Sequence, residues 1–504
     1  MKIRILSTSD IHGFIYPHSY GDGRQMDIGL AKLKTLIDEL RDENTILIDN
    51  GDTLQGSPLT FYHYVNHREE ICPLTTAMKA MNYDFVNLGN HDFNYGWRIL
   101  KKHIDNCGAT LITTNITRNG ERLAPCWQIR ELGGKKVAVI GLVTDYVPNW
   151  EAPENIENLE FLDPFAVLKD ALRELREREK PDYVVCVYHG GFEKDPVSGE
   201  DTEEQTGEDV GYRMITELEG IDFLVAGHQH RVYCGRLGNT VYSEPAFNGM
   251  FLSCMEVDTE TGEKTVRLIR PEGEADPEIC KIAASEEAEC QKWLDTPLGY
   301  CKKDLRIRDE VHDRLYKSQL ATLINRIQME LTGADLSATA IFLRATGMQG
   351  EVSMRDVINT YIFPNTLAVK KITGKVLREY LDFNMNFWSV RNGQIIVNPL
   401  YDFPNPQHHN YDMVDGIEYV AELGKPKGER IAVLRRNGVD VRDDDEFTIA
   451  MNNYRCSGGG GFRMIAECPT VKEYSESVVD IICDYVLKNK VIDFTDVNNI
   501  TVRI

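Results

Sequence analysis

Residues 84–96, DFVNLGNHDFNYG, bring an apolar run to an abrupt end in polar side chains. The first part, 84–88, has the aromatic and aliphatic residues of a short buried strand, and Gly89 interrupts it. An amide, an imidazole and a carboxylate then follow one another at positions 90–92. Ligand sites in open α/β sheets collect at the carboxyl ends of strands, so this strand end is a candidate functional site.

The same pattern, an apolar run followed by polar side chains, recurs at four other places in the first 230 residues. With a further apolar run at 136–143 and an amphipathic helix predicted at 28–40, these runs alternate strand and helix, as in an α/β domain. Strand ends of such a sheet converge on one edge, and five polar ends therefore predict a single site. The four other apolar runs lie at 2–8, 45–49, 182–188 and 222–227.

The side chains at these strand ends are potential metal ligands. Seven are candidates: Asp10, His12, Asp52, Asn90, His189, His228 and His230. Oxygen and imidazole donors without thiolate suit Mn²⁺, Zn²⁺, Fe²⁺ or Co²⁺ rather than a structural cysteine site. Each motif alone is more often a loop or a helix cap, but their conjunction indicates metal binding. Seven ligands exceed one tetrahedral set and serve two divalent metal ions if a carboxylate bridges them.

Composition narrows the classes of function. The chain has 56 Lys and Arg against 79 Asp and Glu, a formal net charge of −23, which argues against long nucleic acids as partners. No apolar stretch is long enough to span a membrane, and the first residues lack the apolar core of a signal peptide. The 12 cysteines are dispersed, which favours a reducing cytoplasm. A periplasmic or extracellular location would require that a signal had been removed. Composition leaves the oligomeric state, monomer or dimer, open.

The chain is too long for one compact core. We expect residues 1–270 to form one domain and a polar, helix-forming linker to occupy 271–299. A second module at 300–504 combines predicted helices with short strands, as in an α+β domain. Its predicted helical segments are 316–331, 354–361 and 374–387.

In order and spacing, the motifs D-x-H, GD, GNHD, H and GH-x-H resemble the signature of the calcineurin-like metallophosphoesterases. Over essentially its whole length the chain is similar to the branch that contains 5′-nucleotidases and 2′,3′-cyclic-nucleotide 2′-phosphodiesterases/3′-nucleotidases. The resemblance implies a four-layer αββα metallophosphoesterase domain followed by a smaller α+β C-terminal substrate-binding domain. It assigns one metal to Asp10, His12, Asp52 and His230, and the other to Asp52, Asn90, His189 and His228.

The resemblance also implies a reaction on small nucleotides. A hydroxide between the metals would attack phosphorus, and His91, which is not a ligand, would assist the leaving oxygen as an acid. Asp92 is expected to support the turn and is the nearest candidate by sequence for a partner of His91. At position 94, 5′-nucleotidases carry an Asp that orients this imidazole. Asn94 can form the hydrogen bond but cannot stabilise a cation by charge.

In this family the C-terminal module holds the nucleobase between two aromatic rings. The matching segments are 409–419 and 451–462, and the resemblance assigns the rings to Tyr411 and Tyr454. Without it, these segments show only aromatic and amide residues beside glycine, which are as typical of core and turn positions. Further candidates for substrate contacts are Asn365, Asn452, Asn453 and Arg455.

Two departures separate the chain from the 5′-nucleotidase pattern. Residues 337–347, SATAIFLRATG, lack the N-G-G-G-I-R segment, and the glycine run 458–461 lacks an Asp. The stretches NNYRCSGGGGF, DNGDTLQGSPL and GNHDFNYG instead resemble the cyclic phosphodiesterase group. We therefore expect a 2′,3′-cyclic-nucleotide 2′-phosphodiesterase/3′-nucleotidase. A 5′-nucleotidase, or a phosphatase of other nucleotide or sugar phosphates, is the alternative. The third hypothesis is a catalytically inert sensor that binds metal.

Overall fold

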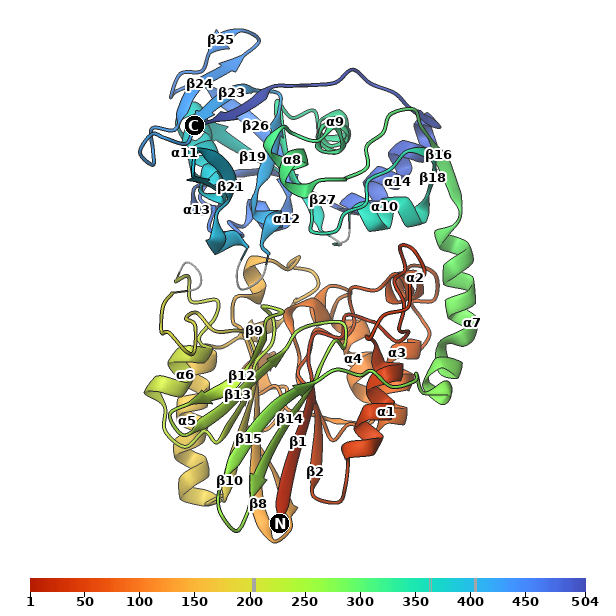
Figure 1. The fold of residues 1–504 in the computed structure, drawn as a ribbon, viewed down its shortest axis with the longest axis vertical. Coiled ribbons are helices and arrows are strands. Elements are labelled where there is room, and N and C mark those ends of the chain that lie inside the picture. Colours follow the sequence, from red (N-terminus) through yellow and green to blue (C-terminus); the bar gives the residue numbers. More distant parts are fainter. Residues whose placement is uncertain (202–204, 362, 364, 403–405) are drawn as a thin grey trace. The chain divides into compact units, whose positions relative to one another are not determined.

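The computed structural model of the chain describes residues 1–504 with the exception of 202–204, 362, 364 and 403–405 (Figure 1). It divides into two compact units, residues 1–291 and 292–504.

Helix α7 (Pro277–Leu294) occupies most of the segment 271–299, which we expected to be a linker between domains. Most of this helix packs as part of the first unit, which ends at residue 291. One contact that holds it is a hydrogen bond of 2.8 Å from Tyr20 Oη to Glu287. The boundary between the units therefore falls near the carboxyl end of the helix.

Two six-stranded sheets make up the centre of the first unit. The first has the order β15-β14-β1-β2-β3-β4 and the second β12-β13-β11-β10-β8-β7. The first comprises β1 (Lys2–Thr8), β2 (Thr45–Asp49), β3 (Phe85–Val86), β4 (Thr110–Leu111), β14 (Leu252–Asp258) and β15 (Lys264–Ile269). The second comprises β7 (Gln128–Leu132), β8 (Lys135–Val143), β10 (Tyr183–His189), β11 (Phe223–Val225), β12 (Val232–Leu237) and β13 (Thr240–Pro245). Strands β1 to β4 pair in parallel, as do β8, β10, β11 and β13, so their carboxyl ends lie along common edges.

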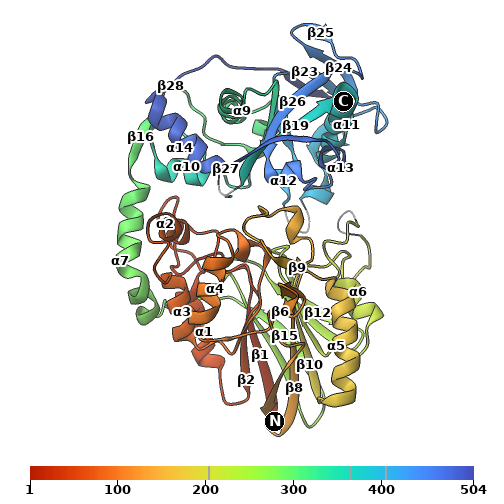
Figure 2. The same ribbon diagram turned by 180° about the vertical axis from the view of Figure 1, so that it is seen from behind.

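The two sheets pack face to face between two layers of helices. A buried apolar cluster between them joins Ile5 and Ile48 of the first sheet to Val139 and Val187 of the second. The outer face of the first sheet is covered by α1 (Leu30–Leu40), α3 (Pro73–Met81) and α4 (Trp97–Asn106), and that of the second by α5 (Pro164–Arg178) and α6 (Gly211–Glu217) (Figure 2). The predicted four-layer αββα domain is confirmed.

Local sequence explains these elements. Strand β2 coincides with the apolar run 45–49 and is buried throughout, as expected of a central parallel strand. Helix α1 buries Leu30, Leu33 and Ile37, the helically spaced residues that predicted it. Strand β3 is shorter than its apolar run: Asn87 N–H still donates to the carbonyl of Asp49 in β2 (2.8 Å), but the N–H of Leu88 bonds to the hydroxyl of Thr113 (2.9 Å).

Two buried amides tie the sheets together beside the polar strand ends. Asn87 Nδ2 donates to the carbonyl of Leu142 in β8 (2.7 Å), and Asn50 Nδ2 donates to the carbonyl of Tyr188 in β10 (3.2 Å). Such buried bonds are costly to break, because they would leave unpaired polar groups. They hold the strand ends of the two sheets in a fixed relation.

The second unit is built on a five-stranded sheet of order β22-β17-β26-β19-β27. Its strands are β17 (Leu336–Ala340), β19 (Thr366–Thr373), β22 (Asp412–Asp415), β26 (Glu446–Asn452) and β27 (Thr470–Ser477). A second sheet contains β23 (Glu418–Glu422), β24 (Ile431–Arg436), β25 (Val439–Asp440) and β29 (Ile500–Arg503). The principal helices are α9 (Gln319–Thr332), α10 (Met354–Thr360), α11 (Gly374–Asn384) and α14 (Val478–Asn489). The first three lie where the sequence predicts helices, and the α+β class is confirmed.

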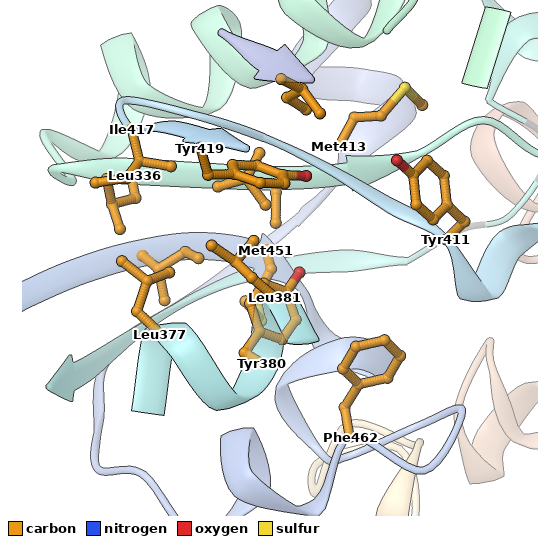
Figure 3. Packing of buried hydrophobic residues seen from close by; sticks show 14 of the residues in the cluster. Leu336, Leu377, Tyr380, Leu381, Tyr411, Met413, Ile417, Tyr419, Met451 and Phe462 are labelled. Atoms are coloured by element: carbon orange, nitrogen blue, oxygen red, sulfur yellow. The ribbon is translucent and has the colours of Figure 1, made fainter. Parts of the chain in front are cut away.

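The core of this unit lies between α11 and the strands β17, β22 and β26 (Figure 3). Leu377 and Tyr380 of α11 pack there with Leu336, Met413 and Met451. All 12 cysteines have free thiols. None of the helices that the structure describes combines the length and the apolar character needed to cross a bilayer.

Asp49, at the end of β2, is an ionisable group buried close to the polar strand ends. Thr8 Oγ1 donates to its Oδ1 (2.7 Å) and Thr53 Oγ1 donates to its Oδ2. Burial raises the pKa of Asp49 to about 7, and the two threonine hydrogen bonds only partly oppose that effect.

We predict that Asp49→Asn changes the pH dependence of stability. An acid with a raised folded-state pKa contributes stability that is complete below its ordinary pKa of 3.8 and is lost as pH rises through about 7. Asn stays neutral, and either threonine hydroxyl can rotate to accept from its amide. Urea unfolding at pH 6 and pH 8 should therefore show the variant gaining stability relative to the parent at the higher pH. Exposed Asp38→Asn is the control. If the difference in unfolding free energy between Asp49→Asn and the parent is the same at pH 6 and pH 8, the assignment is contradicted.

Candidate metal centre

All seven predicted metal ligands lie at the carboxyl ends of parallel strands. The first sheet supplies Asp10 and His12 after β1, Asp52 after β2, and Asn90 in the turn η1 (Asn90–Phe93) after β3. The second sheet supplies His189 as the last residue of β10, and His228 and His230 after β11. The structure thus brings the polar ends of both sheets to one place.

The ligand atoms form two groups that share Asp52. In one, single atoms of Asp10, His12, Asp52 and His230 all lie within 4.8 Å of one another. The other contains Asp52, His189 and His228 within the same limit. Asn90 joins the second group, because its Oδ1 is 2.9 Å from His228 Nδ1. This grouping coincides with the two ligand sets that the family resemblance implies.

Hydrogen bonds at Nδ1 fix the orientation of two of these histidines. His12 Nδ1 lies 2.8 Å from the carbonyl oxygen of Gln55, and His189 Nδ1 lies 2.7 Å from that of Asn50. A carbonyl only accepts, so each Nδ1 carries a hydrogen and each Nε2 is the ring atom left to bind a metal. His189 Nε2 lies 3.3 Å from Asp52 Oδ2.

The residues present fit divalent cations. Asp10 and Asp52 are only 0% and 1% exposed, and buried carboxylates require compensating charge. Asp52 Oδ2 and His189 Nε2 are buried 3.3 Å from each other, and neither atom has a further hydrogen-bond partner among the described residues. Burial alone would lower the pKa of His189, but the charges of Asp52 and Asp10 outweigh it and raise the pKa to about 10. A cation bound here would therefore displace protons and satisfy the unpaired atoms.

The backbone is strained at the site. Five of the seven ligands have left-handed conformations, with φ of 55° at Asp10, 49° at His12, 54° at Asp52, 70° at His228 and 57° at His230. Each costs on the order of 1–3 kcal/mol in a residue other than glycine. Such strain concentrates at functional sites, because only the surrounding structure can hold it.

Gly89 permits the close approach of the loops. A Cβ added there would lie 2.2 Å from Asp52 Oδ1 and 2.7 Å from His189 Cε1. The role of the glycine that ends the run 84–88 is therefore steric: it leaves room for ligands from both groups.

His91 lies beside the ligand groups. Its backbone N–H donates to Asp52 Oδ1 (2.7 Å), and its ring centroid is 5.5 Å from that of His12. Its Nδ1 is 2.8 Å from Asn94 Oδ1. Asn94 therefore makes the contact with His91 that was expected of an orienting residue at this position.

Asp92 is not the partner of His91, and this expectation is corrected. Its carboxylate is buried and accepts backbone N–H bonds from Gly89 (2.8 Å), Asp52 (3.0 Å), Thr53 (2.9 Å) and Leu54 (3.0 Å). Four backbone donors occupy its acceptor sites and turn it away from the imidazole. Asp92 instead supports the turn, as also expected, and holds the loop that carries Asp52.

Comparison with known families supports the same interpretation. Residues 3–232 match the calcineurin-like phosphoesterase family, and residues 297–467 match the 5′-nucleotidase C-terminal domain. The chain belongs to the calcineurin-like phosphoesterases. The resemblance drawn from the motifs is thereby confirmed, and members of this family are hydrolases.

The relatives of this phosphoesterase are named for more than one class of substrate. A candidate 5′-nucleotidase from Staphylococcus aureus, solved in complex with alpha-ketoglutarate, is 32% identical with full coverage of both chains and a TM-score of 0.93. The 2′,3′-cyclic-nucleotide 2′-phosphodiesterase/3′-nucleotidase of Haemophilus influenzae is 25% identical over 91% of this chain and 80% of its own length. The trifunctional nucleotide phosphoesterase YfkN of Bacillus subtilis is 24% identical over 99% of this chain, which spans only 39% of that relative.

Four residues of this phosphoesterase site were missed by sequence reasoning. Glu208 Oε1 lies 2.9 Å from His228 Nε2 and leaves Nδ1 for a metal. Trp150 stacks on His228 (5.3 Å between centroids, 27° between planes), and Phe247 stacks on His230 (4.8 Å, 21°). Glu151 contacts Asn94. None of the four lies in a strand-end motif, so no local pattern indicated them.

In the second unit the structure contradicts the role expected of Tyr411. Its side chain is 0% exposed and stacks on Phe387 (5.1 Å, 28°), within the core shown in Figure 3. The short turn His408–Asn410 directs the following ring inward. A nucleobase cannot stack on a ring that is fully buried, so Tyr411 is a core residue.

Arg455 is likewise structural. It is 2% exposed, its Nε donates to Asp412 Oδ2 (2.7 Å) and its Nη2 donates to the carbonyl of His409 (2.9 Å). Its guanidinium also lies 3.9 Å from the ring centroid of Phe462. A buried, paired charge with these bonds holds the glycine loop and is not available to a substrate.

The remaining candidates lie together where β26 ends and its partner β19 begins. Tyr454 is half-buried and Asn452 caps the turn that contains it. Asn453 Oδ1 accepts from the backbone N–H of Thr366 (3.1 Å), the residue after Asn365. Half-buried Phe363 lies just before β19, whose Leu367 pairs with Asn452. This end of the β19–β26 pair therefore carries two aromatic rings, Phe363 and Tyr454, that are not fully buried.

We predict that Gly89→Ala abolishes or strongly weakens cation binding. Its methyl group would collide with Asp52 Oδ1, and the nearby backbone of Asp52 could not yield without moving a shared ligand. Metal content after dialysis, measured by mass spectrometry, should fall well below that of the parent. Gly273→Ala is the matched control, because a Cβ at this exposed position meets only Thr35 Cγ2 at 3.6 Å. Full metal content in Gly89→Ala would contradict the assignment.

Proposed function

We propose that the protein is a phosphoesterase that hydrolyses small nucleotides with the help of two divalent cations. The observation that carries this proposal is the pair of ligand groups that share Asp52, with His91 beside them. Asp10, His12, Asp52 and His230 would hold one cation, and Asp52, Asn90, His189 and His228 the other. When bound, the cations would stabilise charge on a phosphoryl group and activate water. Mn²⁺, Zn²⁺, Fe²⁺ and Co²⁺ all suit these ligands.

His91 supplies the acid-base group in this proposal. Asn94 Oδ1 only accepts, so the hydrogen bond of 2.8 Å places a hydrogen on His91 Nδ1. When the ring is protonated, Nε2 carries the second proton, which can pass to the leaving oxygen and leave the neutral Nδ1–H form behind. Because His91 is held through its backbone by Asp52 Oδ1, the acid and the ligand groups keep a fixed separation.

Within this class we propose a 2′,3′-cyclic-nucleotide 2′-phosphodiesterase/3′-nucleotidase. Two departures from the 5′-nucleotidase pattern favour this activity. Position 94 is Asn instead of Asp, and the glycine run 458–461 contains no acidic residue. The Haemophilus influenzae relative carries the same name. A 5′-nucleotidase is the second candidate, because the Staphylococcus aureus structure bears that name with the higher identity of 32%.

The second unit is proposed to hold the nucleobase. Tyr454 remains a stacking candidate, and Phe363 replaces Tyr411 as the second ring. Stacking on an aromatic ring contributes about 1–3 kcal/mol per base and is tolerant of base identity. Asn365, Asn452 and Asn453, at the same end of the β19–β26 pair, are proposed to provide polar contacts. The free thiols are consistent with a reducing cytoplasm, which we also propose.

A substrate panel tests the proposed function. We expect protein loaded with Mn²⁺ to hydrolyse 2′,3′-cyclic AMP and 3′-AMP with higher kcat/KM than 5′-AMP. A preference for 5′-AMP of about tenfold or more would favour the second candidate. Failure to hydrolyse any of the three, or a generic aryl phosphate, would contradict the enzymatic function and favour an inert metal-binding sensor.

His91→Ala should separate catalysis from metal binding. Because the ring of His91 is not a ligand in this account, we expect kcat to fall by about a hundredfold or more. Metal content should stay that of the parent protein, as measured by mass spectrometry. His312→Ala, at an exposed histidine of the second unit, should leave both quantities unchanged. Loss of bound metal in His91→Ala would make His91 a ligand instead.

A further inference from the structure

The loop that follows β8 places a carboxylate behind Asn94. Glu151 Oε2 accepts from Asn94 Nδ2 (2.6 Å). Its other oxygen, Oε1, accepts from Asn155 Nδ2 (2.8 Å) and from the backbone N–H of Ala152 (2.8 Å). Asn155 Nδ2 also donates to the backbone carbonyl of Asn94 (3.0 Å). Both oxygens of Glu151 therefore face donors only.

This arrangement determines which way the Asn94 amide points. An isolated amide can present either its oxygen or its NH₂ to a neighbour. A carboxylate can only accept, so Glu151 requires the NH₂ of Asn94 on its own side. The oxygen of Asn94 must then face His91 Nδ1, as it does at 2.8 Å. The donor and the acceptor of both hydrogen bonds, Glu151 to Asn94 and Asn94 to His91, are therefore set by the carboxylate of Glu151.

The same donors favour the ionised form of Glu151. Burial raises the pKa of Glu151 above its usual range, and hydrogen bonds from Asn155, Asn94 and Ala152 only partly oppose that effect. A proton on Oε1 would remove one of these bonds, because two donors already meet that oxygen. Trp150, the preceding residue, stacks on His228, so the loop is anchored on both sides of the site.

We propose that Glu151 is a positioning residue that orients the Asn94 amide and thereby selects the Nδ1–H form of His91. The proposal rests on the role of His91 in the proposed function. It explains how Asn94 can serve where a carboxylate would otherwise be needed. A carboxylate at position 94 would accept from His91 in either orientation, whereas an amide needs a second group to set its direction.

Glu151→Gln should reverse the amide. The oxygen of the introduced glutamine will face Asn155 and Ala152, where two donors meet it, and its NH₂ will face Asn94. Asn94 must then turn its oxygen towards that NH₂ and its own NH₂ towards His91, which leaves Nδ1 without an acceptor. We expect kcat to fall by about tenfold or more with KM within about twofold of the parent, because positioning of the acid is lost and substrate binding is not.

A compensating variant separates positioning from a merely structural role. Asn94→Asp alone places two carboxylates in contact and should lower activity. In Asn94→Asp/Glu151→Gln every bond is restored, because the introduced glutamine donates to the introduced aspartate, which in turn accepts from His91. We expect this double variant to recover kcat to within about threefold of the parent and to exceed both single variants. Exposed Glu154→Gln, on the same loop, is the matched control and should leave kcat unchanged.

The tautomer of His91 provides a readout that is independent of activity. The measurement is ¹⁵N NMR of zinc-loaded protein labelled at the histidine rings. The signals of His91 are identified as those missing from the spectrum of His91→Gln. They should report hydrogen on Nδ1 in the parent and the double variant, and a loss of that form in Glu151→Gln. An unchanged tautomer in Glu151→Gln, or a double variant no more active than Glu151→Gln, would overturn the proposal. If the parent protein hydrolyses no nucleotide, the proposed function fails. The ¹⁵N signals of His91 in the parent and in Glu151→Gln then still test whether Glu151 selects the tautomer.

Discussion

Two buried carboxylates, Asp10 and Asp52, impose the constraint on which the first unit depends. They are 0% and 1% exposed, and charges removed from water in this way must be compensated by neighbours. Burial opposes ionisation of Asp52, but the imidazoles of His189 and His91 lower its pKa well below the usual range. The histidines, the left-handed backbone and the bare Cα of Gly89 all serve to surround these carboxylates with nitrogen and with space for cations.

The two-sheet architecture makes this concentration of ligands possible. A single parallel sheet offers few adjacent strand ends, whereas here loops from two sheets meet over a shared apolar core. Asn50 and Asn87 tie the sheets by buried hydrogen bonds immediately before the ligand-bearing loops. Asp92 then connects the loop after β2 to the turn after β3 through four backbone donors. The positions of the ligands therefore depend on bonds made by residues that bind nothing themselves.

Much of the metal centre could be predicted from the sequence because its residues lie in short motifs at strand ends. The parallel strands bring such ends together wherever the chain places them, so D-x-H and GH-x-H predicted neighbours 218 residues apart, such as Asp10 and His228. Glu151 and Glu208 were missed because each reaches the site from a loop without a periodic pattern. Their partners lie 57 and 20 residues away, respectively. Tyr411 and Arg455 were placed wrongly because residue type alone does not show whether a side chain faces the core.

The central claim is that this chain holds two divalent cations in ligand sets that share Asp52. It is tested most directly by anomalous diffraction from crystals of the full chain grown with Mn²⁺, measured on both sides of the manganese absorption edge. The account predicts two anomalous peaks in the first unit, both in contact with Asp52, one beside Asp10 and His230 and the other beside His189 and His228. A single peak, or two peaks that do not share Asp52, would contradict it.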